Sequence, residues 1–398
     1  MKTVKSVLFA LFVFIAFSAE AQQHSAVRQY PTVGTKGVRN EIYIPKVKGY
    51  NVYTADLHTH TIYSDGEITP ALRVREAWLD GLDIIAITDH MEYRRTEREL
   101  VQFMKGYIDQ SVSNGGKAVN TNVLNKEPDS RGLLVDFNVA HKSAAKEGKK
   151  LDIMVIKGVE ITRGKLGDYN ALFTTDNNAL YDPNLEQTIR NARKQGAFIF
   201  HNHPQYSSKT ATTMPPHCED FHAKGLIDGI EIANGFKTYD RLFDYCLNGN
   251  YAPFATSDAH GLISARFPGA GKDYYRNMTL ILAKERTEKS IKEALKAKRT
   301  IAYTANMLIG KEELLSELFK ACVDVKVLET SKKGTSVLLS NSSSLPFALM
   351  QSGKTEQVLP ANSSAIMTVS KKSKSLKLTV TNVLYGADKP LTVSFELK

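Results

Sequence analysis

Short apolar segments alternate with amphipathic segments of helical length from residue 53 to about residue 303. The apolar segments predict strands at 51–57, 83–88, 151–161, 197–201, 229–233, 253–256 and 278–282. Repeated strand–helix alternation is typical of parallel strands whose two faces are covered by helices. About seven such strands in one run favour a (β/α) barrel over an open sheet. We therefore predict an α/β fold in which residues 51–312 form a barrel.

Helix signals separate these strands. Thr69 is a predicted N-cap with Pro70 at the first helical position, and this helix is expected to run over 70–81. Further helices are expected at 137–149, at 185–194 and, as the last clear helix, at 287–297. Two long intervals, 91–136 and 205–217, fit either a lid over the barrel mouth or a mobile surface insertion.

The composition changes after about residue 309, where Ser, Thr and Lys become abundant. Short runs of alternating apolar residues indicate antiparallel strands at 323–327, 336–339, 365–369 and 376–380. We predict a small β-sandwich accessory domain at 313–398 that carries no chemical constellation of its own.

Most of the chain's basicity lies in this last region. The net charge is +10, and from Lys320 onward there are eleven lysines, no arginine and five acids, a balance of +6. No arginine-rich patch interleaved with aromatic residues is present, so a nucleic-acid partner is not indicated. Solvated lysines on a β-domain explain this charge, and contact with a cell surface or an anionic polymer is the alternative.

The first residues have the pattern of a secretory signal. Lysines precede an apolar run at 7–17 that is too short to span a bilayer, and an Ala-x-Ala pattern ends at Ala21. We predict a signal peptide at 1–21 and a lead-in segment at 22–50. A membrane anchor, the alternative, needs an apolar run of about 20 residues. We therefore expect an exported protein, periplasmic or extracellular, with no transmembrane segment after signal removal.

The cysteines do not form a disulfide framework. Cys218, Cys246 and Cys322 are too few and too scattered, and one disulfide would leave a thiol over. With 42% hydrophobic residues the chain has ample material for a large core without disulfides.

Histidines and acids stand at the ends of successive predicted strands. His58 and His60 follow the first strand and point to the same side, so both imidazoles can reach one metal ion. Buried groups of this kind are costly unless a cation or another partner satisfies them. In a β/α barrel the carboxyl ends of the strands converge on one mouth. The predicted ligand set is His58, His60, Asp65, His90, Glu160, His203, Asp258 and His260.

The ligand types narrow the choice of metal. The set lacks cysteine, which excludes a thiolate zinc site, and imidazole with carboxylate suits Zn²⁺, Mn²⁺ or Fe. So many ligands exceed the needs of one ion, which predicts two or three divalent ions with Glu160 as their bridge. Such a centre offers a bridging hydroxide as nucleophile and clamps phosphoryl oxygens during in-line displacement.

These motifs resemble, in order, those of the PHP family, which is named after polymerases and histidinol phosphatases. The segments are A-D-L-H-T-H-T at 55–61, S-D-G at 64–66, I-T-D-H at 87–90, G-V-E at 158–160, H-P at 203–204 and S-D-A-H at 257–260. The resemblance covers about residues 51–310 and implies a distorted seven-stranded β/α barrel with a two- or three-metal phosphoesterase site. It further implies that one metal is surrounded by His58, His60, Glu160 and Asp258, and that the neighbouring site or sites are completed by Asp65, His90, His203 and His260.

One strand end departs from the family pattern. It reads F-H-N-H-P, so His201 stands two residues before the histidine of the His-Pro pair. Following the motif, we predict that His203 is the ligand and that His201 supports it or contacts the substrate. Asp56 and Asp89 each precede ligand histidines in the chain, and we expect them to orient those rings.

A phosphate substrate needs cationic partners besides the metal ions. Arginine is suited to this because a guanidinium holds phosphate through two parallel hydrogen bonds. Cations in or just after the ligand loops are Arg94, Arg163, Arg266 and Lys272, and surface solvation is the alternative for each. We expect substrate contacts from Arg163, Arg266, His201 and Arg94, and direct catalytic roles for Glu160, His203, His260 and Asp65.

The leading hypothesis for function is hydrolysis of a small phosphate ester outside the cytoplasm. Phosphodiesters come ahead of monoesters because the resemblance includes secreted phosphodiesterase-like members with an accessory β-domain. A metal amidohydrolase also begins with His-x-His at a strand end, but Asp65 and Asp89 fit that class less well. The third alternative is a metal-loaded module that binds polymers through its β-sandwich.

Overall fold

The computed structural model of the protein describes residues 38–96, 119–120, 134–163, 166–204, 216–268, 274–351 and 354–397. The predicted signal peptide, the first part of the lead-in segment, most of both long intervals and Lys272 lie outside these residues. Within the described part of the chain, no helix is both long and apolar enough to cross a membrane.

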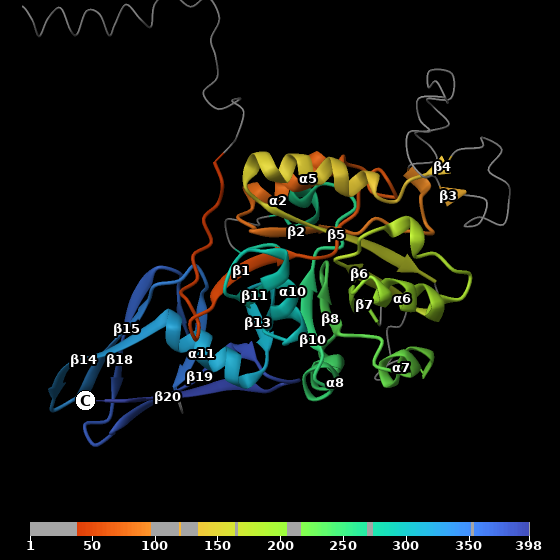
Figure 1. Cartoon of the computed structure of the whole chain (residues 1–398). Helices are drawn as coiled ribbons and strands as arrows, with labels where there is room; N and C mark the ends of the chain where they lie inside the picture. Colours follow the sequence, from red (N-terminus) through yellow and green to blue (C-terminus); the bar gives the residue numbers. More distant parts are fainter. Residues whose placement is uncertain are drawn as a thin grey trace, which may run out of the picture. The chain divides into compact units, whose positions relative to one another are not determined.

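Two groups of parallel strands form the centre of the fold (Figure 1). One group is β1 (Asn51–Asp56), β2 (Ile84–Ile87) and β5 (Met154–Thr162), and the other is β7 (Phe198–Asn202), β8 (Gly229–Asn234) and β10 (Ala252–Thr256). Their positions confirm the strands predicted from the apolar segments. β6 (Asp168–Leu172) joins the two groups and is antiparallel to both β5 and β7. It was not predicted because D-Y-N-A-L has too few apolar positions to show a strand pattern.

The predicted strand at 278–282 exists, but its direction differs from the expectation. β11 (Met278–Ala283) pairs antiparallel with β1, and β12 (Thr300–Thr304) and β13 (Met307–Gly310) extend the sheet on that side, also antiparallel. Among the described residues between β10 and β11, the one helix is the four-residue α9 (Ile263–Arg266). A parallel crossover usually carries a longer α-helix that covers the sheet, and the antiparallel arrangement does not need one.

The described ladders give an open strand order that ends at β10. The end of β10 nevertheless returns to the end of β1, because Thr59 and Ala259 form an isolated parallel bridge. Two backbone hydrogen bonds reinforce it, from Asp258 N to His58 O and from His60 N to Ala259 O, each 3.0 Å long. The architecture is therefore a mixed α/β sheet whose first and last parallel strands meet at their carboxyl ends.

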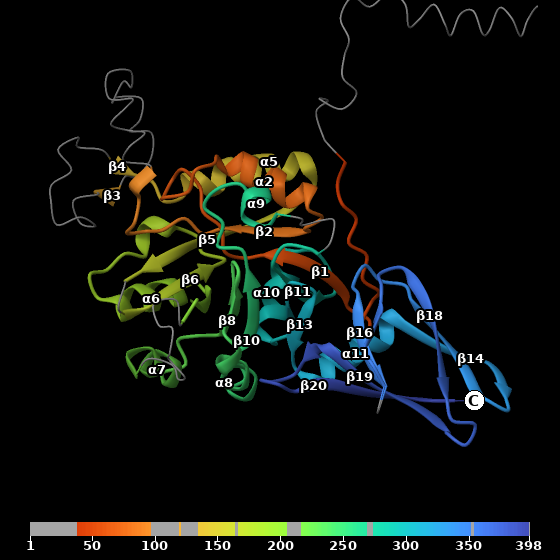
Figure 2. The ribbon, with the colours of Figure 1, turned by 180° about the vertical axis from the view of Figure 1, so that it is seen from behind.

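The predicted helices are present with small shifts of their ends. α2 (Pro70–Leu79) begins as expected, with the Thr69 side chain accepting a hydrogen bond from Leu72 N. The others are α5 (Val139–Leu151), α6 (Leu185–Lys194) and α10 (Glu288–Lys296). α2 and α5 lie side by side beside β2 in Figures 1 and 2. Val74 and Ala144 are fully buried in the same cluster as Ile85.

Shorter elements fill the connections. They are β3 (Val119–Asn120), β4 (Leu134–Val135), η3 (Asn177–Ala179), α7 (Pro216–Ala223), β9 (Lys237–Thr238), η4 (Asp240–Leu242) and α8 (Phe243–Asn248). β3 pairs with β4 inside the first long interval.

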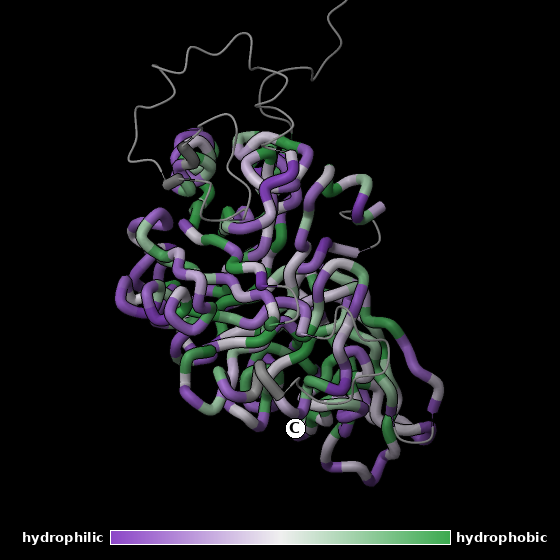
Figure 3. Tube along the Cα trace, turned by 90° about the vertical axis from the view of Figure 1, so that its right-hand side faces the viewer, coloured by the Kyte–Doolittle hydropathy of each residue, from purple (hydrophilic) through white to green (hydrophobic). Residues whose placement is uncertain are grey.

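Aromatic side chains fill the space between the central strands. Phe200 stacks on Phe254 with ring centroids 4.7 Å apart, and Phe198 meets Phe254 edge to face. Hydrophobic segments accordingly run through the middle of the trace in Figure 3, with many hydrophilic ones at outer turns. Because these side chains fill the interior between the strands, polar side chains gather at the carboxyl ends of the strands.

The C-terminal part begins with a helix that the sequence analysis did not predict. α11 (Glu312–Cys322) buries Leu315, Leu318, Phe319 and Cys322, a helical spacing that could have revealed it. One sheet that follows contains β14 (Val323–Ser331), β15 (Gly334–Asn341) and β18 (Ser363–Val369). The other strands are β16 (Phe347–Gln351), β17 (Gln357–Leu359), β19 (Ser375–Leu384) and β20 (Pro390–Glu396), and β19 pairs with β13 of the large sheet.

The two sets of C-terminal strands share one hydrophobic cluster, as a β-rich accessory region requires. Leu339 and Met367 from one sheet and Leu378 and Val393 from the other belong to it. The boundary at residue 312 stays a prediction, because the β13–β19 pairing joins the regions on either side of it. Cys246 and Cys322 are buried free thiols.

Candidate metal centre

All eight predicted ligands converge at the carboxyl ends of the strands. Three overlapping groups have ligand atoms within 4.8 Å of one another: His60, Asp65, His90 and His260; His58, His60 and Asp258; and His58, Glu160 and His203. His58 and His60 each belong to two groups, so the groups form one continuous cluster.

The backbone of several strand ends is shaped to bring these residues together. An isolated bridge pairs His90 with Glu160 beyond the end of β2. His203 and Asp258 have φ angles of 27° and 48°. Non-glycine residues rarely adopt this left-handed region, and such strain is often found at functional sites.

Gly66 is required by the turn that carries Asp65. Its amide donates to Thr61 O at 3.0 Å. A Cβ atom at residue 66 would lie 2.7 Å from Thr61 N, closer than real Cβ contacts. The turn brings Asp65 Oδ2 to 3.2 Å from His260 Nε2 and Asp65 Oδ1 to 3.5 Å from His90 Nε2.

Glu160 lies at the centre of the cluster and uses both of its oxygens. Oε2 is 3.2 Å from His58 Nε2, 3.3 Å from His60 Nε2 and 2.9 Å from His90 Nδ1. Oε1 is 3.6 Å from His203 Nε2 and accepts a 2.8 Å hydrogen bond from Asn202 Nδ2. A carboxylate whose oxygens face different histidines is placed to bridge two ions.

Two observations fit a bound cation. His60 Nδ1 is buried and has no hydrogen-bond partner among the described residues. His58 Nε2 and His60 Nε2 face each other at 3.0 Å, with Asp258 Oδ1 3.1 Å from His60 Nε2. Buried imidazoles and carboxylates aimed at one point suit a borderline divalent metal.

Mutual electrostatics shift the pKa values of the cluster strongly. Burial would raise the pKa of Glu160, but His90 and His58 hold it well below its usual range. Burial would lower the pKa of His90, yet the Glu160 carboxylate raises it to about 9. His203 also reaches about 9, against the effect of burial, through its hydrogen bond to Glu160. Burial together with His260 and His90 lowers the pKa of His60 to about 3, so its ring stays neutral.

Glu231 is a functional candidate that the sequence analysis missed. It is fully buried in β8, and its Oε1 lies 2.7 Å from His58 Nδ1 and accepts a hydrogen bond from Thr256 Oγ1. Its Oε2 accepts from His203 N at 2.8 Å. Glu231 therefore fixes the ring of one ligand and the backbone of another. An acid inside the apolar segment G-I-E-I-A was the available signal.

Asp56 and Asp89 do not orient the rings as predicted. Asp56 accepts hydrogen bonds from Ser257 N and from the buried Arg276, and Asp89 accepts from both the amide and the hydroxyl of Thr61. These carboxylates therefore fix the ligand-bearing loops. The rings of His58 and His90 are oriented instead by Glu231 and by Thr162 Oγ1, which is 2.6 Å from His90 Nδ1.

A buried arginine ties two ligand loops together. Arg73 Nη2 donates to the carbonyl oxygens of His60, Ala259, His260 and Gly261 at 2.9–3.2 Å. Its Nη1 donates to Glu76 Oε2 at 2.9 Å, and Glu76 Oε1 accepts from Ile263 N. Arg73 therefore fixes the loop after β1 relative to the loop after β10.

The two histidines at the carboxyl end of β7, His201 in the strand and His203 just after it, have different surroundings. His203 points to Glu160, whereas His201 Nδ1 is 3.2 Å from His222 Nε2 and its ring stacks on Tyr169. His201 is in none of the three groups. The geometry therefore favours His203 as the ligand.

The predicted substrate arginines are not equally placed. Arg94 is buried, donates to His90 O and lies over the Phe137 ring. Arg163 pairs with Glu92 at 3.1 Å and donates to Asp182 O. Arg266 is half-buried and lies against Gly235, where a Cβ atom would be 2.5 Å from Arg266 Nη2. Arg94 and Arg163 are therefore engaged in holding loops.

Similarity to known proteins supports the interpretation of this cluster as a metal site. Residues 56–198 match the family model of the PHP domain. A two-domain protein from Bacteroides vulgatus ATCC 8482, which contains a predicted PHP-like metal-dependent phosphoesterase, is similar in structure. The two chains are 30% identical, the match covers 92% of this chain and 100% of the other, and the TM-score is 0.76.

A more distant relative matches part of the chain. It is an uncharacterized protein of Methanocaldococcus jannaschii, 29% identical over 157 residues. The match covers 36% of this chain and 65% of that protein, so the chain spans less than two thirds of its length.

Proposed function

Because the chain belongs to the PHP family, we propose that this hydrolase acts on phosphate esters outside the cytoplasm, with phosphodiesters as preferred substrates. The observation that carries the proposal is the cluster around Glu160, whose two oxygens face different histidines. The predicted signal peptide motivates the exported location.

Two or three divalent ions, Zn²⁺, Mn²⁺ or Fe, would occupy the cluster. His58, His60, Glu160 and Asp258 would hold one ion, and Asp65, His90, His203 and His260 would complete the neighbouring site or sites. When bound, such ions would lower the pKa of a water molecule so that it can act as the nucleophile, and they would neutralise phosphoryl oxygens.

The protein's own residues would position the ions and the reacting groups. His260 has the most accessible side chain of the eight ligands, at 33%, and Asp65 lies 3.2 Å from its Nε2. Its Nδ1 is 3.0 Å from Asp258 O, so His260 would hold an ion through Nε2 at the opening of the site, where the substrate would enter. Asn202, by donating to Glu160 Oε1, keeps that carboxylate in its bridging orientation.

Arg266 is the arginine best placed for substrate phosphate. It follows the His260 loop, and its Nε is buried without a hydrogen-bond partner among the described residues. A guanidinium with donors to spare can bind phosphate bidentately.

The proposed barrel is distorted and seven-stranded, made of β1, β2, β5, β6, β7, β8 and β10, so that β6 replaces β11, the seventh strand expected from the sequence. The bridge between Thr59 and Ala259, which joins the first strand end to the last, supports it. Closure would bring every ligand loop to one mouth.

A paired rate assay tests the function. The purified mature protein is reconstituted with Mn²⁺ or Zn²⁺ and offered bis-p-nitrophenyl phosphate and p-nitrophenyl phosphate. Faster diester cleavage is the expected result, and faster monoester cleavage would reassign the enzyme as a phosphatase. If neither ester reacts with either metal, the proposal is wrong and amide substrates become the next to try.

A further inference from the structure

Two lysine-bearing turns lie side by side at one end of the β14–β15–β18 sheet. The first joins β14 to β15 across the Ser331–Gly334 pair, and the second follows β18. β15 pairs with β18 so that Thr335 lies opposite Val369. A Cβ atom on Gly334 would lie 2.4 Å from Val369 O, so the two turns nearly touch. We call this end the lysine tip, made of Lys332, Lys333, Lys371, Lys372 and Lys374.

The lysine tip is exposed and lacks local neutralisation. All five lysines are exposed, and none forms an ion pair with another residue in the described ranges. Residues 331–334 and 370–377 contain no acid, and they hold six of the eleven lysines found from Lys320 onward. Glu396, on β20, pairs across the strands with Ser375 of β19 and not with a lysine of the tip. Elsewhere lysines meet acids directly, as in Lys142 with Asp136 and Lys224 with Glu186.

Hydrogen bonds hold the backbone of both turns while the lysine side chains stay free. Ser331 Oγ donates to Gly334 O and accepts from Lys333 N. In the second turn Ser373 N donates to Ser370 O at 2.9 Å. The tip therefore presents exposed ammonium groups on turns whose backbone is held by hydrogen bonds.

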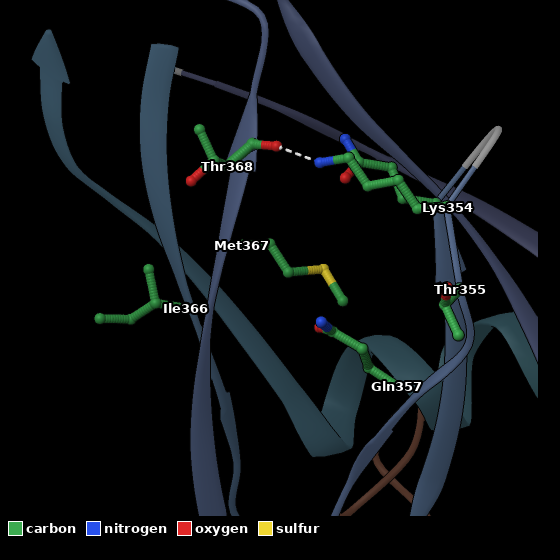
Figure 4. A pocket seen from close by; sticks show the side chains of 7 residues that line it. Lys354, Thr355, Gln357, Ile366, Met367 and Thr368 are labelled. Atoms are coloured by element: carbon green, nitrogen blue, oxygen red, sulfur yellow. Dashed lines mark hydrogen bonds between the residues drawn. The ribbon is translucent and has the colours of Figure 1, made fainter. Parts of the chain in front are cut away.

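The lysine tip is better suited to a flat surface with spread negative charge than to an anionic polymer such as a nucleic acid. The chain has no arginine after Arg299, so bidentate phosphate recognition is absent there, and residues 331–334 and 370–375 hold no aromatic ring for stacking on bases. A pocket of about 220 Å³ lies beside β18, but its lysine, Lys354, already donates to Thr368 O at 2.8 Å (Figure 4). Anionic lipid surfaces attract clustered lysines at about 1 kcal/mol each without specific geometry.

We propose that the lysine tip docks the protein on the anionic surface of a lipid bilayer. Ile366, which is 61% exposed three residues before the end of β18, adds an apolar contact near the tip. Docking would hold the hydrolase at a membrane without a transmembrane segment.

Vesicle co-sedimentation of the full chain tests the proposal. Vesicles of phosphatidylglycerol and phosphatidylcholine are compared with phosphatidylcholine alone, at low and at about 0.3 M NaCl. Binding is expected only to the anionic vesicles and only at low salt. The tip variant should bind at least about tenfold more weakly; it combines Lys332→Gln, Lys333→Gln, Lys371→Gln and Lys372→Gln.

A charge-matched control separates location from net charge. It combines Lys146→Gln, Lys149→Gln, Lys289→Gln and Lys296→Gln, four exposed lysines of α5 and α10. The control should bind like the wild type, and both variants should keep wild-type turnover of a soluble ester, which keeps this test independent of the proposed catalysis. Equal loss in both variants, or no binding by the wild type, would overturn the proposal. Binding to soluble polyphosphate but not to vesicles would overturn it in favour of a polymer partner.

Discussion

Buried polar side chains gather at the ligand end of the large sheet, whereas the C-terminal strands bury mostly apolar ones. At the ligand end, His58, His60 and Glu160 are completely buried, and the backbone is strained at His203 and Asp258. In the C-terminal strands, Leu376, Leu378 and Val380 alternate with exposed or half-exposed residues in a regular sheet pattern. At the ligand end, buried polar groups and a strained backbone lower the folding stability, whereas the C-terminal strands raise it through apolar packing.

The comparison leads to an expectation about single substitutions. Changes at the ligand end should alter metal binding and turnover far more than folding. Changes in the C-terminal core should alter folding while leaving the metal affinity intact. The following predictions test this separation, from the largest expected effect on turnover to the smallest.

Glu160→Ala should have the largest effect on activity. It removes the carboxylate that faces three histidines with one oxygen and His203 with the other. Turnover should fall by about 10³-fold and the metal content should drop. The exposed Glu285→Ala serves as control and should change neither. Full activity of Glu160→Ala with normal metal content would remove Glu160 from the centre.

His203→Ala should weaken metal binding by roughly 10- to 100-fold, whereas His201→Ala should leave it near the wild-type value. Both side chains belong to the same strand end, so the pair is closely matched. Only His203 is within 3.6 Å of Glu160, while His201 faces His222. Isothermal titration with Zn²⁺ measures the difference. The reverse order would show that His201 is the ligand.

Arg73→Lys should reduce metal affinity by about tenfold, because a lysine ammonium group cannot donate to all four carbonyl oxygens that Arg73 Nη2 contacts. The matched control is Arg39→Lys. Arg39 also donates to carbonyl oxygens, those of Trp78, Gly81 and Leu82, away from the ligands. Metal titration and the melting temperature should be measured together. If both variants lose the same stability and neither loses metal affinity, Arg73 has only a structural role.

Metal affinity should rise with pH and level off above about pH 9. In the metal-free protein, His90 and His203 have pKa values of about 9, so both carry a proton at pH 7 that metal must displace. The raised pKa values also mean that these rings stabilise the metal-free fold below about pH 6.5. That contribution is lost as the pH rises toward 9. Melting curves with and without Mn²⁺ should therefore separate further at pH 9 than at pH 6.5, and a gap that narrows would contradict the assignment.

Leu378→Ala should have the smallest effect on turnover and a clear effect on folding. Leu378 is fully buried in the hydrophobic cluster that the C-terminal strands share with part of the large sheet, and removing such a side chain costs about 2–5 kcal/mol. Urea unfolding should register the loss, while the Zn²⁺ affinity of the folded protein stays at the wild-type value. A large fall in metal affinity would show that the two regions are coupled.

Sequence patterns predicted the parallel strands because each is an apolar run with a clear boundary. They could not predict the direction of β11, since pairing direction depends on the connection and on the neighbouring edge. β6 was not predicted because a five-residue segment with two polar residues is too short and too weakly apolar to indicate a strand. α11 did carry a helical pattern, at Leu315, Leu318 and Phe319, which the change in composition obscured.

The candidate site was predictable as a set of residue types but not as a network of contacts. The eight ligands follow from His and acid residues at strand ends, and the structure brings them into one cluster. Glu231, Thr162 and Arg73 act on those ligands through contacts between residues up to 188 positions apart in the chain. Sequence spacing contains no information about such partners, and the same limit explains why Arg94 and Arg163 were expected at the substrate.

The most direct test of the central claim is the number and position of bound metal ions. Crystals of the protein reconstituted with Mn²⁺ should be measured for anomalous scattering, with elemental analysis of the same sample. At least two ions per chain, with Glu160 between them, is the predicted result. A single ion, or ions that Glu160 does not touch, would contradict the account of a carboxylate-bridged centre.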